Sequence, residues 1–397
     1  MRIFFAILFT LSLLQAQSIN QLIQQSLKKH PSLKTIQHRL SAMDERIEKS
    51  QQWANPDLSF TINDIQFEDP TNRSLEPMQY NAVNYQQKFP WFGKLAARKT
   101  YAQEQKHVVL DSYEAARVQL ALQIRTTAYT IKELEARIAI LHRYSQLARQ
   151  NIKLYTDTIA TDSMSHADSI TAELSLSKIE IRSERYRSLL KSQEEKLCYL
   201  IQRNITKVSD TLSIQKPGSL KRYLNKISHN PTYHMKLSQN RVADANKALL
   251  DLETHPDPYV KVGYFNRQAY NDYASVTVGF SLPLYDTEEL NSEIARKEAL
   301  SSLSASLDYK AFLESEIRAN YAKLKEAYRI YHIIQAKSLP QLKHLLELSS
   351  SAIEEGADLF TYTNILEQKL ALEEESIAIK AEYLRTKAKL KALTGVI

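Results

Sequence analysis

Apolar residues recur at alternating spacings of four and three from Lys94 to Thr161, as they do in the seam of a coiled coil. Neither glycine nor proline occurs between Gly93 and Pro217, so the two strongest helix breakers are absent. The pattern predicts a single helix over residues 94–161. At 1.5 Å per residue, such a helix would be about 100 Å long, which exceeds the size of a compact domain.

The residues before this helix predict a shorter helix followed by a β-hairpin. Helical periodicity begins at Ile19 and ends before Asn55-Pro56, because the residue before a proline disfavours helix. Two runs of alternating apolar and polar residues follow, and they predict a hairpin over residues 57–89. After the long helix, cap and turn residues favour a reversal, and the pattern predicts a return helix over residues 169–203.

The same order of elements occurs twice, at a spacing of about 200 residues. A linker at residues 210–218 contains Pro217-Gly218 and separates a first repeat, residues 17–209, from a second repeat, residues 219–397. The second repeat is predicted to contain a helix, a hairpin over residues 259–282, a long helix over residues 288–355 and a final helix over residues 359–393.

Two details of the second repeat predict its packing. Pro340 should kink the second long helix, because proline removes a helical hydrogen bond. The final helix carries two offset apolar stripes, whereas a simple two-stranded coiled coil needs only one seam. We therefore expect this helix to have helical neighbours on both flanks.

The first 16 residues have the features of an export signal. Arg2 precedes an apolar run from Ile3 to Leu14, and Ala16 provides a small residue at the cleavage position. The run is too short for a membrane-spanning helix. We expect cleavage after Ala16, without lipid attachment, because no cysteine lies there.

Composition excludes several function classes. Only 6 glycines and 11 prolines occur in 397 residues, which favours long elements with few connections. The net charge of +7 comes from charges of both signs spread along the chain, so we expect no nucleic-acid partner. Cys198 is the only cysteine, and it is assigned to packing. The ten histidines lack ligand spacing and no catalytic motif occurs, so we expect no enzyme, no cofactor and no metal site.

The four predicted strands are long enough to cross a bilayer, for which about 9–11 residues suffice when a strand is tilted. Transmembrane barrels have at least about eight strands, so several copies of the chain would have to contribute. A small soluble sheet in the periplasm is the alternative.

Two segments resemble the TolC-like outer-membrane efflux protein family, also called outer membrane factors. They are Tyr85–Lys94, which reads YQQKFPWFGK, and Glu355–Leu359, which reads EGADL. The order of elements is similar to that family over nearly the whole mature chain. The resemblance implies a mainly α fold with a small β part. Duplicated long-helix hairpins would form a trimeric α-helical tube joined to a 12-stranded transmembrane β-barrel, with four strands from each chain.

The resemblance also implies a location and a function. The barrel would lie in the outer membrane of a Gram-negative bacterium, in contact with its lipid, and the helical tube would lie in the periplasm. The homotrimer would passively export drugs, metal ions or other small molecules as the exit component of a tripartite efflux system. Its partners would be a periplasmic adaptor (membrane fusion) protein and an inner-membrane pump of the RND or ABC type. The alternatives are a periplasmic coiled-coil structural or adaptor protein, and the exit duct of a type I protein secretion system.

Three groups of candidate site residues follow. The turns of the helical hairpins are predicted to be the tips that dock the adaptor, at Ser165, His166, Ala167, Asp168, Gly356, Ala357 and Leu359. By the resemblance, a pore constriction would lie just beyond the second tip, at Asp358, Thr361, Asn364 and Glu367. Aromatic residues at or near strand ends are predicted to anchor the membrane interface, namely Tyr85, Phe89, Trp91, Phe92, Tyr264 and Tyr285.

Each group has a simpler interpretation. The tips could be ordinary solvated turns, and Asp358 could merely cap the final helix. The aromatic residues could fill the core where strands meet helices.

Overall fold

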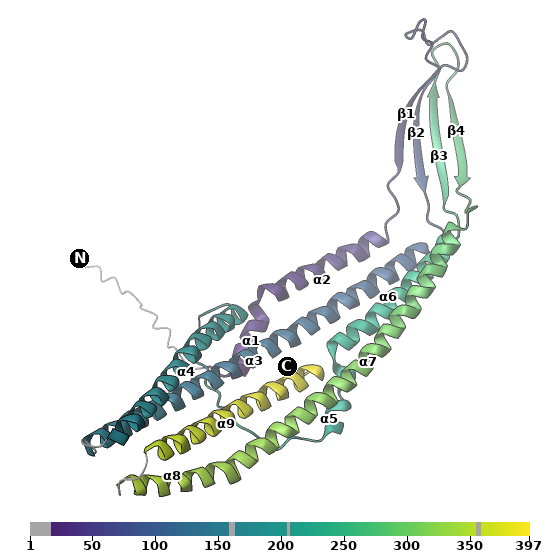
Figure 1. The fold of residues 1–397 in the computed structure, drawn as a ribbon. Coiled ribbons are helices and arrows are strands. Elements are labelled where there is room, and N and C mark those ends of the chain that lie inside the picture. The colour runs from purple at the N-terminus through teal and green to yellow at the C-terminus, as the bar shows by residue number, and fades with distance from the viewer. Residues whose placement is uncertain (1–16, 159–162, 205–206, 355–358) are drawn as a thin grey trace, which may run out of the picture. The chain divides into compact units, whose positions relative to one another are not determined.

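The computed structural model describes residues 17–158, 163–204, 207–354 and 359–397 (Figure 1). The chain is mainly helical with one four-stranded sheet, so the predicted fold class is confirmed. It divides into two compact units. One comprises Met1–Lys34, Glu114–Pro231 and Ala311–Ile397, and the other comprises Thr35–Tyr113 and Thr232–Lys310.

The second unit contains the sheet. Its strands are β1 (Asp57–Asn63), β2 (Tyr80–Lys88), β3 (Pro258–Asn266) and β4 (Tyr273–Phe280). All neighbours are antiparallel, in the order β1-β2-β3-β4, so β2 and β3 join the two hairpins into one sheet. Strands β1 and β4 are the edges of this sheet.

The helices of this unit follow the order of the strands. Asp44 of α2 (Pro31–Ser50) pairs with Lys106 of α3 (Lys94–Thr158) at 2.5 Å. Glu104 of α3 pairs with Arg241 of α6 (Pro231–Glu253) at 2.9 Å. Asp251 of α6 accepts a hydrogen bond from Ser292 of α7 (Thr287–Ile333). The order α2-α3-α6-α7 therefore matches the order β1-β2-β3-β4, and each strand is continuous in sequence with its own helix.

Lys94 links the connection between β2 and α3 to the connection between α6 and β3. Its side chain is only 2% exposed, and its Nζ lies 2.8 Å from Asp257 Oδ1 and 3.3 Å from Glu253 Oε2. The same ammonium donates to the carbonyl of His255 at 2.7 Å, and the Trp91 amide donates to Asp257 at 2.8 Å. Gly93 precedes it with φ of +87°, a value that glycine adopts without strain. The residues around Lys94 thus fix the start of α3 against the start of β3.

Asp257 is held ionised by this Lys94 cluster. Burial by itself would raise the pKa of Asp257, but hydrogen bonds from Lys94 and the Trp91 amide and the charges of Lys94 and Arg98 outweigh it. The net effect places the pKa of Asp257 below its ordinary value.

The first unit contains the remaining helices. They are α1 (Ile19–Lys29), α4 (Ser163–Ile201), α5 (Leu220–Leu224), α8 (Leu339–Glu354) and α9 (Leu359–Leu393), with a short 3₁₀ helix at Ile227–His229. Helix α1 begins with a capping box in which Ser18 and Gln21 satisfy each other's backbone amides. None of the described helices is both long enough and apolar enough to cross a membrane.

Two sequence-based boundaries differ from the structure. Helix α4 begins at Ser163 and not at residue 169, because serine and aspartate are tolerated in a first turn as well as in a loop. The second long helix is not continuous over residues 288–355. A π-helix at Ile334–Ser338 separates α7 from α8, directly before Pro340. Pro340 has no backbone N–H to donate, and the wider π-helical turn before it adjusts the hydrogen bonding of the helix. The Leu339 amide donates to the carbonyl of Ile334.

Replacing Lys94 by methionine should destabilise the protein by about 2–3 kcal/mol, because two carboxylates lose their partner at a largely buried position. Thermal unfolding of the purified protein measures this loss. Arg98→Met is the matched control, since Arg98 is 35% exposed and pairs with Glu253 at 2.9 Å. An equal loss in both variants would contradict the central role of Lys94.

The effect of Asp257→Asn should depend on pH. Because the folded-state pKa is lowered, the ionised carboxylate stabilises the fold above its unfolded-state pKa of about 3.9, and this stabilisation is lost as the pH falls through the folded value. The difference in melting temperature between wild type and Asp257→Asn should therefore be largest near neutral pH and shrink below about pH 4. A difference that stays constant with pH would contradict this.

Candidate functional site

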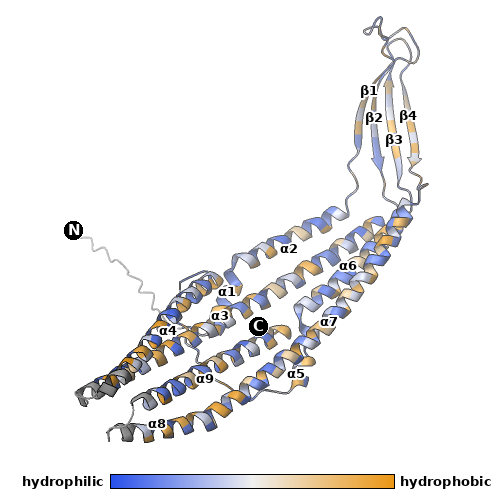
Figure 2. Ribbon diagram, viewed as in Figure 1, coloured by the Kyte–Doolittle hydropathy of each residue, from blue (hydrophilic) through white to orange (hydrophobic). Residues whose placement is uncertain are grey.

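The strands place apolar side chains on one face of the sheet in continuous rows. Strand register aligns Phe60, Val83, Tyr264 and Ala274 in one row, and Leu58, Tyr85, Val262 and Val276 in the next. The large side chains of these rows are exposed, and Val276 and Val278 on β4 are 70% and 71% exposed. The apolar stripes are visible along the strands in Figure 2. In a water-soluble protein a sheet buries its apolar face, so the exposure of the apolar face here is the reverse of that arrangement.

The opposite face of the sheet carries the small and polar residues. Its central row contains Ser59, Asn84, Gly263 and Ser275. Asn84 is buried, and a Cβ at Gly263 would lie 2.6 Å from its Oδ1 atom, so glycine makes room for the amide. The ring of Tyr259 lies over Gly279 in the same way, where a Cβ would come within 2.5 Å of the ring. Apart from the contacting rings of Tyr80, Phe265 and Tyr273 at one end, this side of the sheet is small and polar, whereas the other side is apolar and uncovered.

The predicted anchor residues lie in this unit in different environments. Phe92 and Tyr285 are 86% and 87% exposed, and Tyr85 and Tyr264 stand in the exposed apolar rows. Phe89 packs edge-on against Trp53 at 5.2 Å, and Trp91 stacks on His255 at 5.7 Å. Packing therefore accounts for part of the role of Phe89 and Trp91, whereas the other four remain candidates for lipid contact.

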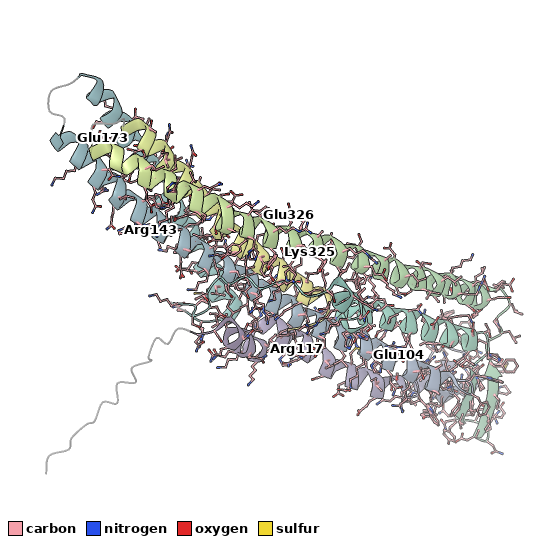
Figure 3. All side chains as sticks on the ribbon, turned by 90° about the horizontal axis from the view of Figure 1, so that it is seen from below. Glu104, Arg117, Arg143, Glu173, Lys325 and Glu326 are labelled. Atoms are coloured by element: carbon pink, nitrogen blue, oxygen red, sulfur yellow. The ribbon has the colours of Figure 1, made fainter. Side chains whose placement is uncertain are left out.

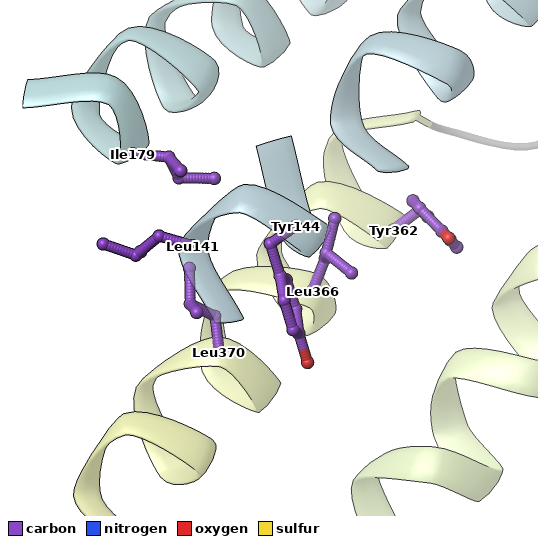
Figure 4. Close-up of a cluster of buried hydrophobic side chains, with 6 residues drawn as sticks. All are labelled: Leu141, Tyr144, Ile179, Tyr362, Leu366 and Leu370. Carbon is purple, nitrogen blue, oxygen red and sulfur yellow. The ribbon is translucent and has the colours of Figure 1, made fainter. Parts of the chain in front are cut away.

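The first unit has a buried apolar cluster that joins three helices. It is shown in Figure 4 and contains Leu141 and Tyr144 from α3, Ile179 from α4, and Tyr362, Leu366 and Leu370 from α9. Burial raises the pKa of the Tyr144 hydroxyl, and the neighbouring charge of Glu373 raises it further. The cluster fixes the first half of α9 against the hairpin formed by α3 and α4.

Polar contacts surround this cluster and also join α9 to α3 and α4. Arg143 of α3 pairs with Glu373, and Ser175 of α4 donates to Glu367. Glu374 is 7% exposed and pairs with Arg182 of α4 at 2.8 Å. Figure 3 shows Arg143 among the many charged side chains along the helices. Sequence reasoning missed these α9 ion pairs, although the run of three glutamates at 373–375 was a possible signal.

The candidate constriction residues are only partly described. Asp358 lies outside the described residues. Thr361 and Asn364 are exposed on α9, whereas Glu367 is half-buried and bonded to Ser175. Glu367 is therefore directed toward α4 in this chain, and it does not share the exposed stripe of the other two residues.

The candidate tip residues are described even less completely. Gly356 and Ala357 lie outside the described residues, and Leu359 is the first residue of α9. Ser165, His166, Ala167 and Asp168 belong to the first turns of α4, and not to the preceding turn as expected. Their assignment to adaptor docking stays a prediction.

Solved structures share this architecture. The outer membrane protein VceC from Vibrio cholerae is 14% identical, with a TM-score of 0.79 over 95% of this chain and 96% of that chain. The open state of the MtrE outer membrane channel from Neisseria gonorrhoeae is 13% identical, with a TM-score of 0.77 over 95% of this chain and 89% of that chain. The CmeC outer membrane channel from Campylobacter jejuni is 14% identical, with a TM-score of 0.75 over 95% and 85% of the two chains. The fold is therefore that of outer-membrane channels.

Part of the sequence also matches a family model. Residues 22–201 match the model of the outer membrane efflux protein family. No curated protein matches the chain. The predicted resemblance to outer-membrane efflux proteins is thus confirmed by the family match over residues 22–201 and by the fold over nearly the whole chain.

Glu374→Gln should loosen α9, because the substitution removes the charge that pairs with Arg182 at a buried position. Amide hydrogen exchange in the first half of α9 should become about tenfold faster, which corresponds to about 1.4 kcal/mol. The neighbouring Glu375 is exposed, so Glu375→Gln is a matched control and should leave exchange unchanged. Equal exchange in the two variants would show that the Arg182–Glu374 pair does not hold α9.

Proposed function

We propose that three copies of this chain form a passive exit duct in the outer membrane of a Gram-negative bacterium. The observation that carries the proposal is the sheet with one exposed apolar face and one polar face. In a transmembrane barrel the apolar face meets lipid and the polar face lines the lumen, which is the arrangement that these rows require.

The edges of the sheet support an assembly of several chains. Within one chain β1 and β4 each pair on one side only, and an unpaired backbone group in lipid costs several kcal/mol. Pairing β4 of one copy with β1 of the next removes both edges. Three copies then give the 12 strands that the resemblance implies.

The substrates would pass through the lumen without chemical change, so no enzymatic activity is proposed. Drugs, metal ions or other small molecules would enter through a periplasmic adaptor protein and an inner-membrane pump of the RND or ABC type. The docking tips would lie at Ser165–Asp168 and at Gly356, Ala357 and Leu359. The efflux family match over residues 22–201 supports this role.

A periplasmic coiled-coil adaptor fits the observations less well. Such a protein would expose the rows around Phe60, Val83 and Val276 to water, and uncovered apolar faces of this size favour aggregation. Cell fractionation distinguishes an outer-membrane duct from a periplasmic adaptor. Recovery in the outer membrane, a trimer in unboiled gel samples and stable conductance in planar bilayers are expected for the duct. Soluble release from the periplasm would overturn it.

A lysine on the apolar face should block membrane assembly. Val276→Lys, at the middle of β4, would place a charge against lipid in every copy, at a cost of about 2–4 kcal/mol for each near the bilayer midplane. The amount of trimer in the outer-membrane fraction should fall strongly. Thr277→Lys is the matched control, because its neighbouring position faces the polar side and should tolerate the charge. Equal assembly of both variants would contradict the proposed orientation of the sheet.

Neutralising its charge tests the proposed pore constriction. Neutralising the proposed ring with Asp358→Asn should weaken the block of single-channel currents by divalent cations, because this carboxylate is repeated three times around the pore. Glu375→Gln serves as a charge-matched control farther along α9. Unchanged conductance and cation block would remove Asp358 from the constriction and leave the duct itself intact.

A further inference from the structure

The charged residues of the four strands all lie on the polar face of the sheet. They are Asp57 on β1, Lys88 on β2 and Lys261 on β3, and β4 has none. Asp57 and Lys261 stand opposite Gln86 on its two sides, and Lys88 is two residues from Gln86. Because side chains alternate along a strand, all three share the face of Asn84. This face therefore carries two positive charges and one negative charge, and the apolar face carries none.

The two lysines are diagonal neighbours on adjacent strands. Lys88 stands opposite Tyr259, and Lys261 is two residues beyond Tyr259 on β3. Diagonal neighbours of this kind have Cβ atoms about 7–8 Å apart, within reach of one ligand for two long side chains. Lys88 is also the last residue of β2, so the pair lies toward the end of the sheet that leads into α3. Lys88 and Lys261 are here called the lysine pair.

The tyrosine opposite Lys88 leaves the space beside the lysine pair open. A Cβ at Gly279 would lie 2.5 Å from the ring of Tyr259, so this ring leans over β4 and away from β2. Glycine at position 279 makes this orientation possible, since any side chain there would displace the ring. Lys88 is exposed and Lys261 is partly exposed, so both ammonium groups are accessible from the polar face.

The lysine pair has no counter-charge within the part of the chain that the structure describes. Asp257 and Glu253, on the nearby approach to β3, are both bound to Lys94. Neither lysine of the pair forms an ion pair with a described carboxylate. Two adjacent ammonium groups repel each other, and an anion with several oxygen atoms removes this repulsion and accepts charge-assisted hydrogen bonds from both.

We infer that the lysine pair is a luminal site for anionic solutes that carry phosphate or carboxylate groups. The inference rests on the proposed trimeric duct and narrows its cargo to this chemical class. Three copies would bring six lysine charges against three charges from Asp57 to one level of the lumen. Like charges gathered around a pore raise the local concentration of the opposite ion. The occupant is a dissolved anion and not a lipid phosphate, because the opposite face of the sheet is the apolar one.

Block of single-channel currents by inorganic pyrophosphate tests this site in the full chain. Lys88→Gln combined with Lys261→Gln should raise the pyrophosphate concentration for half block about tenfold in low salt, because the charge-assisted contacts are lost. Lys28→Gln combined with Lys34→Gln is the matched control. It removes the same charge from exposed helix positions in the other compact unit, and it should leave the block unchanged. Asp57→Asn should strengthen the block, because it removes the negative charge of the same face.

Equilibrium binding provides a second measurement that does not depend on conduction. Purified full-length protein in detergent should bind pyrophosphate, and the Lys88→Gln, Lys261→Gln variant should bind it about tenfold more weakly than the control variant. Equal block and equal binding in the two double variants would overturn the inference, and stable conductance in both would leave the duct intact. Binding that requires the lysine pair in a protein that forms no conducting channel would instead overturn the duct and retain the anion site.

Discussion

The constraint on which the structure depends is that a sheet with an exposed apolar face must have a non-aqueous medium beside it and partners at its edges. In this chain the rows through Phe60, Val83 and Val276 have no covering layer among the described residues. At about 25 cal/mol for each Å² of apolar surface, leaving such rows in water would cost many kcal/mol. Lipid on one face, a polar lumen on the other and neighbouring copies at β1 and β4 satisfy all of these requirements together.

The connections between strands and helices give the long helices the same order as the strands. Lys94 stands at the start of α3 and binds Asp257, Glu253 and the His255 carbonyl, all of which belong to the approach to β3. The order of strands and the order of helices can agree only if each connection is short and fixed. A buried lysine with several acceptors gives this fixation, because an unpaired ammonium at that position would be strongly unfavourable.

Periodicity predicted most of the fold because long elements repeat the same signal many times. The heptad seam of α3 and the alternation in the strands each extend over many residues, and one irregular position does not obscure them. Features that depend on single residues were not predictable in the same way. The start of α4 at Ser163 is a local choice between similar polar residues, and the partners of Lys94 and Glu374 lie far away in sequence. The same holds for the candidate site. The resemblance indicated the region in which it lies, but it could not predict that Ser175 donates a hydrogen bond to Glu367.

In helix α9 the periodic pattern predicted the packing, whereas the contacts of single residues were visible only in the structure. Its two offset apolar stripes predicted neighbours on both flanks, and α9 contacts α4 on one flank and α8 with the preceding π-helix on the other. Leu366 and Leu370 face the cluster with α3 and α4, while Ser376 accepts a hydrogen bond from Gln335 of the π-helix. The side of α9 that bears Glu367, Glu373 and Glu374 is thereby committed to contacts within the chain. The exposed stripe through Thr361 and Asn364 is the side left for a lumen or a neighbouring copy, so a constriction built from α9 would depend on these two neutral side chains more than on Glu367.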